Sequence, residues 1–172
     1  MRELILGGVR SGKSALAERR ALESGLPVTY IATATAGDEE MAVRIAHHRQ
    51  RRPPSWRIIE EPLQLAAALQ AHAAANHCLL VDCLTLWLTN LLLVADATRY
   101  ERERTLLLEL LPTLPGQIVL VSNEVGLGIV PLGELSRRFA DEAGRLHQHL
   151  ATCCERVTFV AAGLPLTLKG PA

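Results

Sequence analysis

The sequence has few aromatic residues, no excess of charge and almost no lysine. Trp, Tyr and Phe make up 3% of its 172 residues, and 18 basic residues balance 18 acidic ones. A core with so few rings must be built from aliphatic side chains, and platforms on which single-stranded bases could stack are scarce. A formal charge of zero provides no overall field that attracts a polyanion. We therefore expect no nucleic-acid partner.

The sequence also lacks a C-x-x-C pair, a signal-peptide pattern and a long uninterrupted apolar segment. Its four cysteines are Cys78, Cys83, Cys153 and Cys154. This pattern favours free thiols and a cytoplasmic location. The most apolar stretch, residues 79–95, contains Asp82, Thr85, Thr89 and Asn90. A membrane helix needs about 20 mostly apolar residues, so a buried strand followed by a helix is predicted instead.

Short aliphatic runs alternate with segments of helical periodicity along the chain. This alternation predicts an α/β fold with a mostly parallel sheet flanked by helices, in a single domain covering residues 1–172. The predicted strands cover residues 3–6, 28–33, 78–82, 118–122 and 157–161, with shorter ones near 57–59 and near 167. The predicted helices cover residues 13–24, 38–51, 63–75, 84–95, 100–111 and 132–153.

A glycine-rich motif of the form G-x-x-x-x-G-K-[ST] follows the first predicted strand, as Gly7-Gly8-Val9-Arg10-Ser11-Gly12-Lys13-Ser14. The glycines allow successive backbone N–H groups to point at phosphate oxygens, and the following helix adds the positive end of its dipole. Lys13 would reach the β- and γ-phosphates, and the Ser14 hydroxyl would bind Mg²⁺. The alternative is a glycine turn that carries Lys and Ser by chance. The strand before the motif and the helix after it favour a nucleotide site.

An acid that ends a second buried strand is the usual partner of such a loop, where it holds Mg²⁺ directly or through water. Asp82 fits, because it ends the run Leu79-Leu80-Val81. A helix-capping carboxylate would occupy the same place. We favour the metal role.

Histidines and arginines fill five of the six positions in His47-His48-Arg49-Gln50-Arg51-Arg52. One interpretation is a solvated helix end whose cations favour the helix dipole. The other is that the arginines clamp a polyphosphate while one neutral imidazole attacks phosphorus and forms a phosphoramidate. Spacing alone does not decide between these readings or between the two histidines.

A polar segment, Asn123-Glu124, ends the fourth long strand. Ligands of open α/β sheets bind outside the carboxyl ends of strands, so these side chains either face the nucleotide or acceptor, or satisfy the backbone of a turn. On the next helix Arg137, Asp141 and Arg145 recur every four residues. That spacing predicts a structural ion-pair ladder.

Four segments together resemble one family over essentially the whole chain: GGVRSGKS, YIATATAGDEEMAVRIAHHRQRRPPSWRIIEEP, LLVDCLTLWLTNLL and VSNEVGLGIVPLGELSRRFADEAGRLHQ. The family is the bifunctional adenosylcobinamide kinase and adenosylcobinamide-phosphate guanylyltransferase of cobalamin biosynthesis. The resemblance implies a RecA-like sheet, a homotrimer, and two substrates, a nucleoside triphosphate and a corrinoid. It further implies phosphorylation of the aminopropanol hydroxyl of adenosylcobinamide with ATP or GTP. GMP would then pass from GTP to that phosphate through a guanylylated histidine.

The resemblance also assigns roles to positions in this chain. His47 matches the histidine that carries GMP, and Lys13 of the phosphate loop is the second expected catalytic residue. The implied nucleotide-binding positions are Gly7, Gly8, Val9, Arg10, Ser11, Gly12, Lys13, Ser14, Ala32, Thr33, Ala34, His48, Arg49, Gln50, Arg51, Glu60 and Asp82. The chain departs from the family pattern at two positions on the last long helix. Ala140 stands where Arg is common, and His147 stands where Asn is common. They put acceptor or trimer contacts in doubt rather than the nucleotide chemistry.

We therefore expect a Mg²⁺-dependent P-loop enzyme in which Ser14 and Asp82 hold the metal and His47 carries GMP. Two rivals stay open. One is a P-loop kinase for another small alcohol, without a covalent nucleotidyl intermediate. The other is a binding module that depends on nucleoside triphosphate.

Overall fold

A computed structural model describes residues 1–35, 53–96 and 98–171. Its centre is a seven-stranded sheet in the order β3-β2-β4-β5-β1-β6-β7. Every neighbouring pair is parallel except β6 and β7, which are antiparallel. The strands are β1 (Arg2–Gly7), β2 (Val28–Ala32), β3 (Arg57–Glu60), β4 (Cys78–Asp82), β5 (Gln117–Asn123), β6 (Arg156–Ala161) and β7 (Leu164–Lys169).

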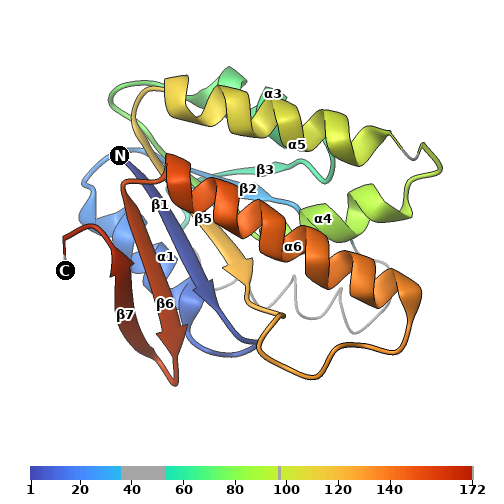
Figure 1. The fold of residues 1–172 in the computed structure, drawn as a ribbon. Helices are drawn as coiled ribbons and strands as arrows, with labels where there is room; N and C mark the ends of the chain where they lie inside the picture. The colour runs from blue at the N-terminus through green and yellow to red at the C-terminus, as the bar shows by residue number, and fades with distance from the viewer. Residues whose placement is uncertain (36–52, 97, 172) are drawn as a thin grey trace.

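Helices cover both faces of this sheet (Figure 1). The buried side chains of α1 pack on one face, and those of α3 to α6 pack on the other. Because both faces are covered, the central strands are almost continuously apolar, as in Leu79-Leu80-Val81 of β4. The helices are α1 (Lys13–Glu23), α3 (Leu65–His72), α4 (Leu84–Leu93), α5 (Arg99–Leu110) and α6 (Glu134–Cys153), with a 3₁₀ turn η1 (Leu111–Thr113).

The strand order places three chain segments together at the carboxyl edge of the sheet. β5 lies between β1 and β4, with Asn123 beside Gly7 and Val121 beside Asp82. The glycine-rich motif and Asp82 therefore lie at the same edge, with the end of β5 between them. The predicted α/β fold with a mostly parallel sheet is confirmed.

Most elements expected from the pattern are present, with ends that differ by a few residues. The two shorter predicted strands exist as β3 and β7, and the most apolar stretch divides into β4 and α4. The helix predicted over residues 38–51 lies outside the described residues. Within the described residues, none of the helices has both the length and the apolar character needed to cross a bilayer.

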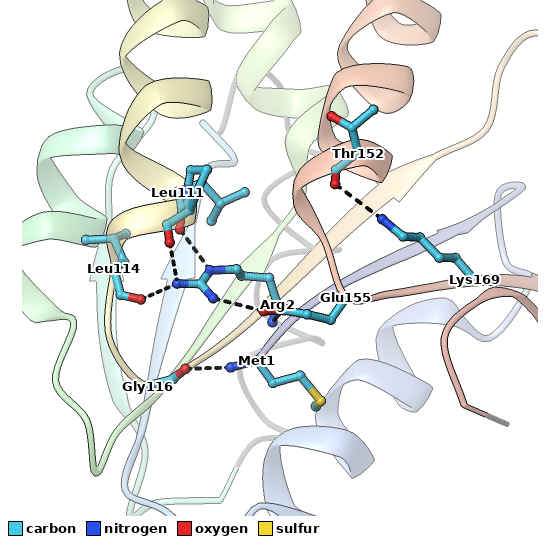
Figure 2. Close-up of polar contacts among 9 residues, drawn as sticks. Met1, Arg2, Leu111, Leu114, Gly116, Thr152, Glu155 and Lys169 are labelled. Atoms are coloured by element: carbon cyan, nitrogen blue, oxygen red, sulfur yellow. Dashed lines mark hydrogen bonds and ion pairs between the residues drawn. The ribbon is translucent and has the colours of Figure 1, made fainter.

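The amino-terminal edge of the sheet is held by the side chain of Arg2 (Figure 2). Its guanidinium donates to the carbonyls of Leu111 and Pro112, each at 2.9 Å, and to that of Leu114. It also forms an ion pair with Glu155 at 2.9 Å. These contacts join β1 to the end of α5 and to the start of β6.

Lys169, one of the two lysines, closes the end of α6 (Figure 2). Its ammonium donates to the carbonyls of Ala151 at 2.7 Å and Thr152 at 3.2 Å. The last carbonyls of a helix have no partner within the helix and form the negative end of its dipole, so a cation there is stabilising. Lys169 is therefore a structural residue.

Candidate nucleotide-binding site

The predicted phosphate loop joins β1 to α1 and has the backbone that its glycines allow. Gly12 has φ of 98°, a left-handed conformation, and Arg10 also has a positive φ of 57°. The Ser11 N–H donates to the Gly8 carbonyl at 3.2 Å, which curls the loop. A Cβ added to Gly7 would lie 2.5 Å from both the Ser11 Oγ and the Val160 carbonyl oxygen. Only glycine fits at that position without a shift of the backbone.

Lys13 reaches back over this loop from the first turn of α1. The residue is only 8% exposed, and its Nζ donates to the Gly8 carbonyl at 3.1 Å. Burial lowers the pKa of Lys13, while the charges of Asp82 and Cys83 oppose that change. The ammonium is thus held close to the loop with little water around it, where an anion would interact with it strongly.

Ser11 provides a second sign of an anion site within the loop. Its hydroxyl oxygen is buried and has no hydrogen-bond partner in the part of the chain that the structure describes. Buried polar atoms of folded proteins are almost always hydrogen-bonded, to protein, water or ligand. A phosphate oxygen is a suitable partner for this hydroxyl.

Ser14 and Asp82 are the two oxygen donors that could hold a divalent cation. Ser14 is the second residue of α1 and Asp82 is the last of β4, and both side chains are half-buried. Asp82 is also close enough to Lys13 to affect its pKa. A hydroxyl and a carboxylate beside bound phosphates are a donor set that suits Mg²⁺, which keeps part of its water shell.

The ends of β2 and β4 are tied together by Thr33. Its hydroxyl is fully buried, donates to the Cys83 carbonyl at 2.7 Å and accepts the Cys83 N–H at 3.0 Å. The Ala32 carbonyl accepts the Glu61 N–H at 2.9 Å, and Glu60 pairs with Ala32 in the register of β3 and β2. Ala32, Thr33, Ala34 and Glu60 therefore lie along the same edge as the phosphate loop, on the far side of β4 and β5.

The histidine and arginine cluster lies outside the described residues. This applies to His47, the predicted carrier of GMP, and to four of the predicted nucleotide-binding positions, His48, Arg49, Gln50 and Arg51. The described part of the chain thus brings together the phosphate loop, Asp82 and the ends of β2 and β3.

The C-terminal hairpin supports the phosphate loop, a contact that the sequence did not reveal. The Gly163 N–H donates to the Ser11 carbonyl at 2.8 Å. Ala162 and Gly163 form a two-residue turn between β6 and β7 with φ values of 51° and 79°, as in the type I′ turns that suit hairpins. A Cβ added to Gly12 would lie 3.1 Å from the Gly163 Cα, so the two segments are in close contact. The Ala-Gly dipeptide between two apolar runs was the only available signal.

Polar side chains at the end of β5 form a second group beside the loop. Asn123 donates to the Thr85 hydroxyl at 2.8 Å, and the Glu124 N–H donates to the Gly7 carbonyl at 3.0 Å. One Glu124 carboxylate oxygen accepts the Gly126 N–H. The turn-satisfying interpretation is therefore correct for that oxygen, while Asn123 contacts α4.

His147 is buried beneath this group rather than exposed for surface contacts. Its Nε2 lies 2.7 Å from the Ser122 Oγ, and its Nδ1 lies 3.8 Å from a Glu124 carboxylate oxygen. The side chains near it on α6 do not form the predicted ladder. Arg145 pairs instead with Glu142, and Arg137 donates to the carbonyls of Pro131 and Leu132. The departure at position 147 thus affects packing under the site.

These observations define the class of protein to which the chain belongs. A glycine-rich phosphate loop between β1 and α1, an acid at the end of β4 and an intervening β5 are the features of a P-loop nucleotide-binding protein with a RecA-like sheet. A solved structure from Pyrococcus horikoshii OT3 has a similar fold, with a TM-score of 0.55 and 11% sequence identity. The similarity covers 99% of this chain and 87% of that one.

The sequence comparisons place the chain within that class. The family model described as cobinamide kinase / cobinamide phosphate guanyltransferase matches residues 3–168, and the chain belongs to this family. The bifunctional adenosylcobalamin biosynthesis protein CobP of Pseudomonas aeruginosa is 69% identical over 170 residues, covering 99% of this chain and 98% of the relative. The CobU proteins of Escherichia coli K12 and Salmonella typhimurium LT2 are each 40% identical, covering 96% of this chain and 98% of each relative. The family expected from the four segments is confirmed.

Proposed function

We propose that this chain phosphorylates adenosylcobinamide with ATP or GTP and then transfers GMP from GTP to the resulting phosphate, giving adenosylcobinamide-GDP. A single domain covering residues 1–172 would perform both reactions. The observation that carries the proposal is the phosphate loop, with its buried Lys13 and a Ser11 hydroxyl that has no partner among the described residues, in a chain that matches the family over residues 3–168.

In this proposal the phosphate loop binds the triphosphate in both reactions. The loop amides and Lys13 hold the β- and γ-phosphates, while Ala32, Thr33, Ala34 and Glu60 contact the nucleotide along the edge of the sheet. Ser14 and Asp82 would hold Mg²⁺, which when bound neutralises charge on the phosphate oxygens. Lys13, already desolvated, provides a fixed positive charge for the oxygens that become more negative during transfer.

His47 would carry GMP between the two substrates. Its neutral imidazole nitrogen attacks the α-phosphorus of GTP, the bond to the bridging oxygen breaks, and pyrophosphate leaves. An oxygen of the acceptor phosphate then attacks the same phosphorus and releases the imidazole. His48, Arg49, Gln50 and Arg51 would bind the charged groups around it.

Labelled nucleotide tests both reactions. GTP labelled at the α-phosphate should leave label on the protein that is lost in acid, survives base and disappears in His47→Ala. The matched control is His149→Ala, which removes an exposed histidine of α6. ATP labelled at the γ-phosphate should label cobinamide. An adduct that His47→Ala does not change would refute the covalent step, and absence of labelled cobinamide would refute the kinase.

A homotrimer in the cytoplasm is proposed as well. Support comes from exposed apolar side chains, which mark contact surfaces when they gather in large patches. Leu127, Ile129 and Leu132 lie in the segment that follows β5, and Leu164, Leu166 and Leu168 lie along β7. Light scattering should give three times the chain mass of 18.7 kDa. The mass of a single chain would contradict the trimer.

A further inference from the structure

The two reactions proposed for this chain differ in what the acceptor must lose. In the first, an alcohol oxygen attacks phosphorus and must lose its proton. In the second, the acceptor is a phosphate monoester, which is already mostly ionised near neutral pH because its second pKa is about 6. A residue that removes the proton is therefore needed for phosphorylation but not for guanylyl transfer.

Glu124 stands where such a residue is needed. Its N–H donates to the carbonyl of Gly7, the first residue of the phosphate loop, at 3.0 Å. It directly follows β5, the strand that lies between the loop on β1 and Asp82 on β4. The carboxylate thus originates between the residues that would hold the phosphates and the residue that would hold the metal.

The other acids at this edge are further away or already engaged. Among the described residues, the carboxylates that directly follow or end a strand here are Glu60, Glu61, Asp82 and Glu124. Of these four, only Glu124 follows a strand that pairs directly with β1, the strand that leads into the phosphate loop. One Glu61 oxygen accepts the N–H groups of Leu63 and Gln64, and Asp82 is assigned to the metal.

The surroundings of Glu124 hold its carboxylate in place and leave one of its oxygens without a hydrogen bond to the described residues. One oxygen accepts the Gly126 N–H, and the other lies 3.8 Å from the His147 Nδ1, too far for a hydrogen bond. The side chain is 22% exposed, so a substrate can reach it. Burial lowers the pKa of His147, although Glu124 opposes this, so this imidazole takes up a proton less readily than an ordinary histidine.

We propose that Glu124 is the general base of the phosphorylation reaction. The acceptor hydroxyl oxygen forms a bond to the γ-phosphorus, the bond from that phosphorus to the β-bridging oxygen breaks, and ADP leaves. The proton of the hydroxyl passes to the free carboxylate oxygen of Glu124 and then to solvent. The inference rests on the proposed function, because it requires an alcohol in one reaction and a phosphate in the other.

The test compares both reactions in one preparation of Glu124→Gln, which keeps an oxygen to accept the Gly126 N–H but removes the base. Phosphorylation of cobinamide and guanylyl transfer to chemically prepared cobinamide phosphate are measured side by side. The kcat for phosphorylation divided by the kcat for guanylyl transfer should fall by about 10²- to 10⁴-fold, the usual contribution of general base catalysis. The KM for ATP should change little, because the phosphate loop is intact.

Two further variants keep the test decisive. Glu109→Gln, at an exposed acid of α5, should leave both reactions as in the wild type. Glu124→Asp keeps a base on a shorter arm, and its ratio should lie between those of the wild type and Glu124→Gln. Far-UV circular dichroism shows whether each variant is folded. Equal losses in both reactions, or undiminished phosphorylation, would overturn the role of Glu124, whereas a wild type without either reaction would overturn the proposed function.

Discussion

Arg2 and Lys169 at the amino end of the central sheet differ from Ser11 and Lys13 at its carboxyl end in how completely their polar groups are bonded. At the amino end, the Arg2 guanidinium is bonded to three carbonyls and to Glu155, and Lys169 is bonded to the last carbonyls of α6. At the carboxyl end, the buried Ser11 hydroxyl has no partner among the described residues, and Lys13 donates to one carbonyl of its own loop.

The difference separates stability from function. Charged groups that are fully bonded stabilise the fold and have nothing left to offer a ligand. Groups that are buried but incompletely bonded carry a desolvation penalty that a ligand relieves. The two lysines illustrate this contrast, since Lys169 stabilises a helix end while Lys13 is held ready for phosphate.

The largest effect is expected at Lys13. We predict that Lys13→Ala lowers the rate of phosphorylation by about 10²- to 10³-fold, as when one charge-stabilising donor is removed. The free protein should unfold at a similar or higher temperature, because burial already disfavours this charge.

Lys169→Ala is the matched control for Lys13→Ala. It should keep both activities and lose about 0.3 to 1 kcal/mol of unfolding free energy, because a helix end loses its cation. Steady-state kinetics and urea denaturation of both variants measure these outcomes. If Lys13→Ala lowered the free energy of unfolding and left the reaction rates unchanged, Lys13 would be a structural residue like Lys169.

A smaller effect, confined to stability, is expected at Arg2. Arg2→Ala should lower the free energy of unfolding by about 2 to 3 kcal/mol, because the carbonyls of Leu111, Pro112 and Leu114 lose a charged donor. Arg19→Ala breaks only an exposed pair with Glu23 at 3.9 Å and should cost less than about 0.5 kcal/mol. The measurement is urea denaturation, with the rate per folded molecule unchanged in both variants. A lower rate in Arg2→Ala would show that the two ends are coupled.

The smallest effect is a pH dependence from His147. Burial lowers the pKa of this imidazole, with Glu124 opposing, so the unfolded chain takes up the proton at a higher pH than the folded one. Stability should therefore decline as the pH falls from about 7.5 to about 5.5, through the ordinary histidine pKa of about 6.5. His147→Asn should show a shallower decline in urea denaturation at the two pH values. If the free energy of unfolding declined equally in the wild type and in His147→Asn, His147 would stay unprotonated across this range or would not affect stability.

Local features of the site were predictable from sequence. The phosphate loop is defined by residues within one turn, because Gly12 needs a positive φ and Lys13 begins a helix. The position of Asp82 at a strand end was predictable because a run of continuous aliphatic residues precedes it. The strands and helices could be predicted from apolar periodicity because that pattern, too, is local in the sequence.

Contacts between distant segments could not be predicted in this way. The Ser11 bond to Gly163, the Ser122 contact with His147 and the ion pair of Arg2 with Glu155 join residues far apart in the chain. They depend on which strands become neighbours, and periodicity gives the strands without their order. Glu124 was a candidate from sequence, but its place between the phosphate loop and Asp82 depends on β5 lying between β1 and β4.

The support of the phosphate loop by the C-terminal hairpin also has a consequence for synthesis on the ribosome. β1 and the loop are made before their partners, because β1 pairs with β5 and β6 and the loop bonds to Gly163. The loop therefore gains these neighbours only after residue 163 has been translated. Because a ligand stabilises only the state that binds it, nucleotide then favours chains that include this hairpin over shorter ones still being made.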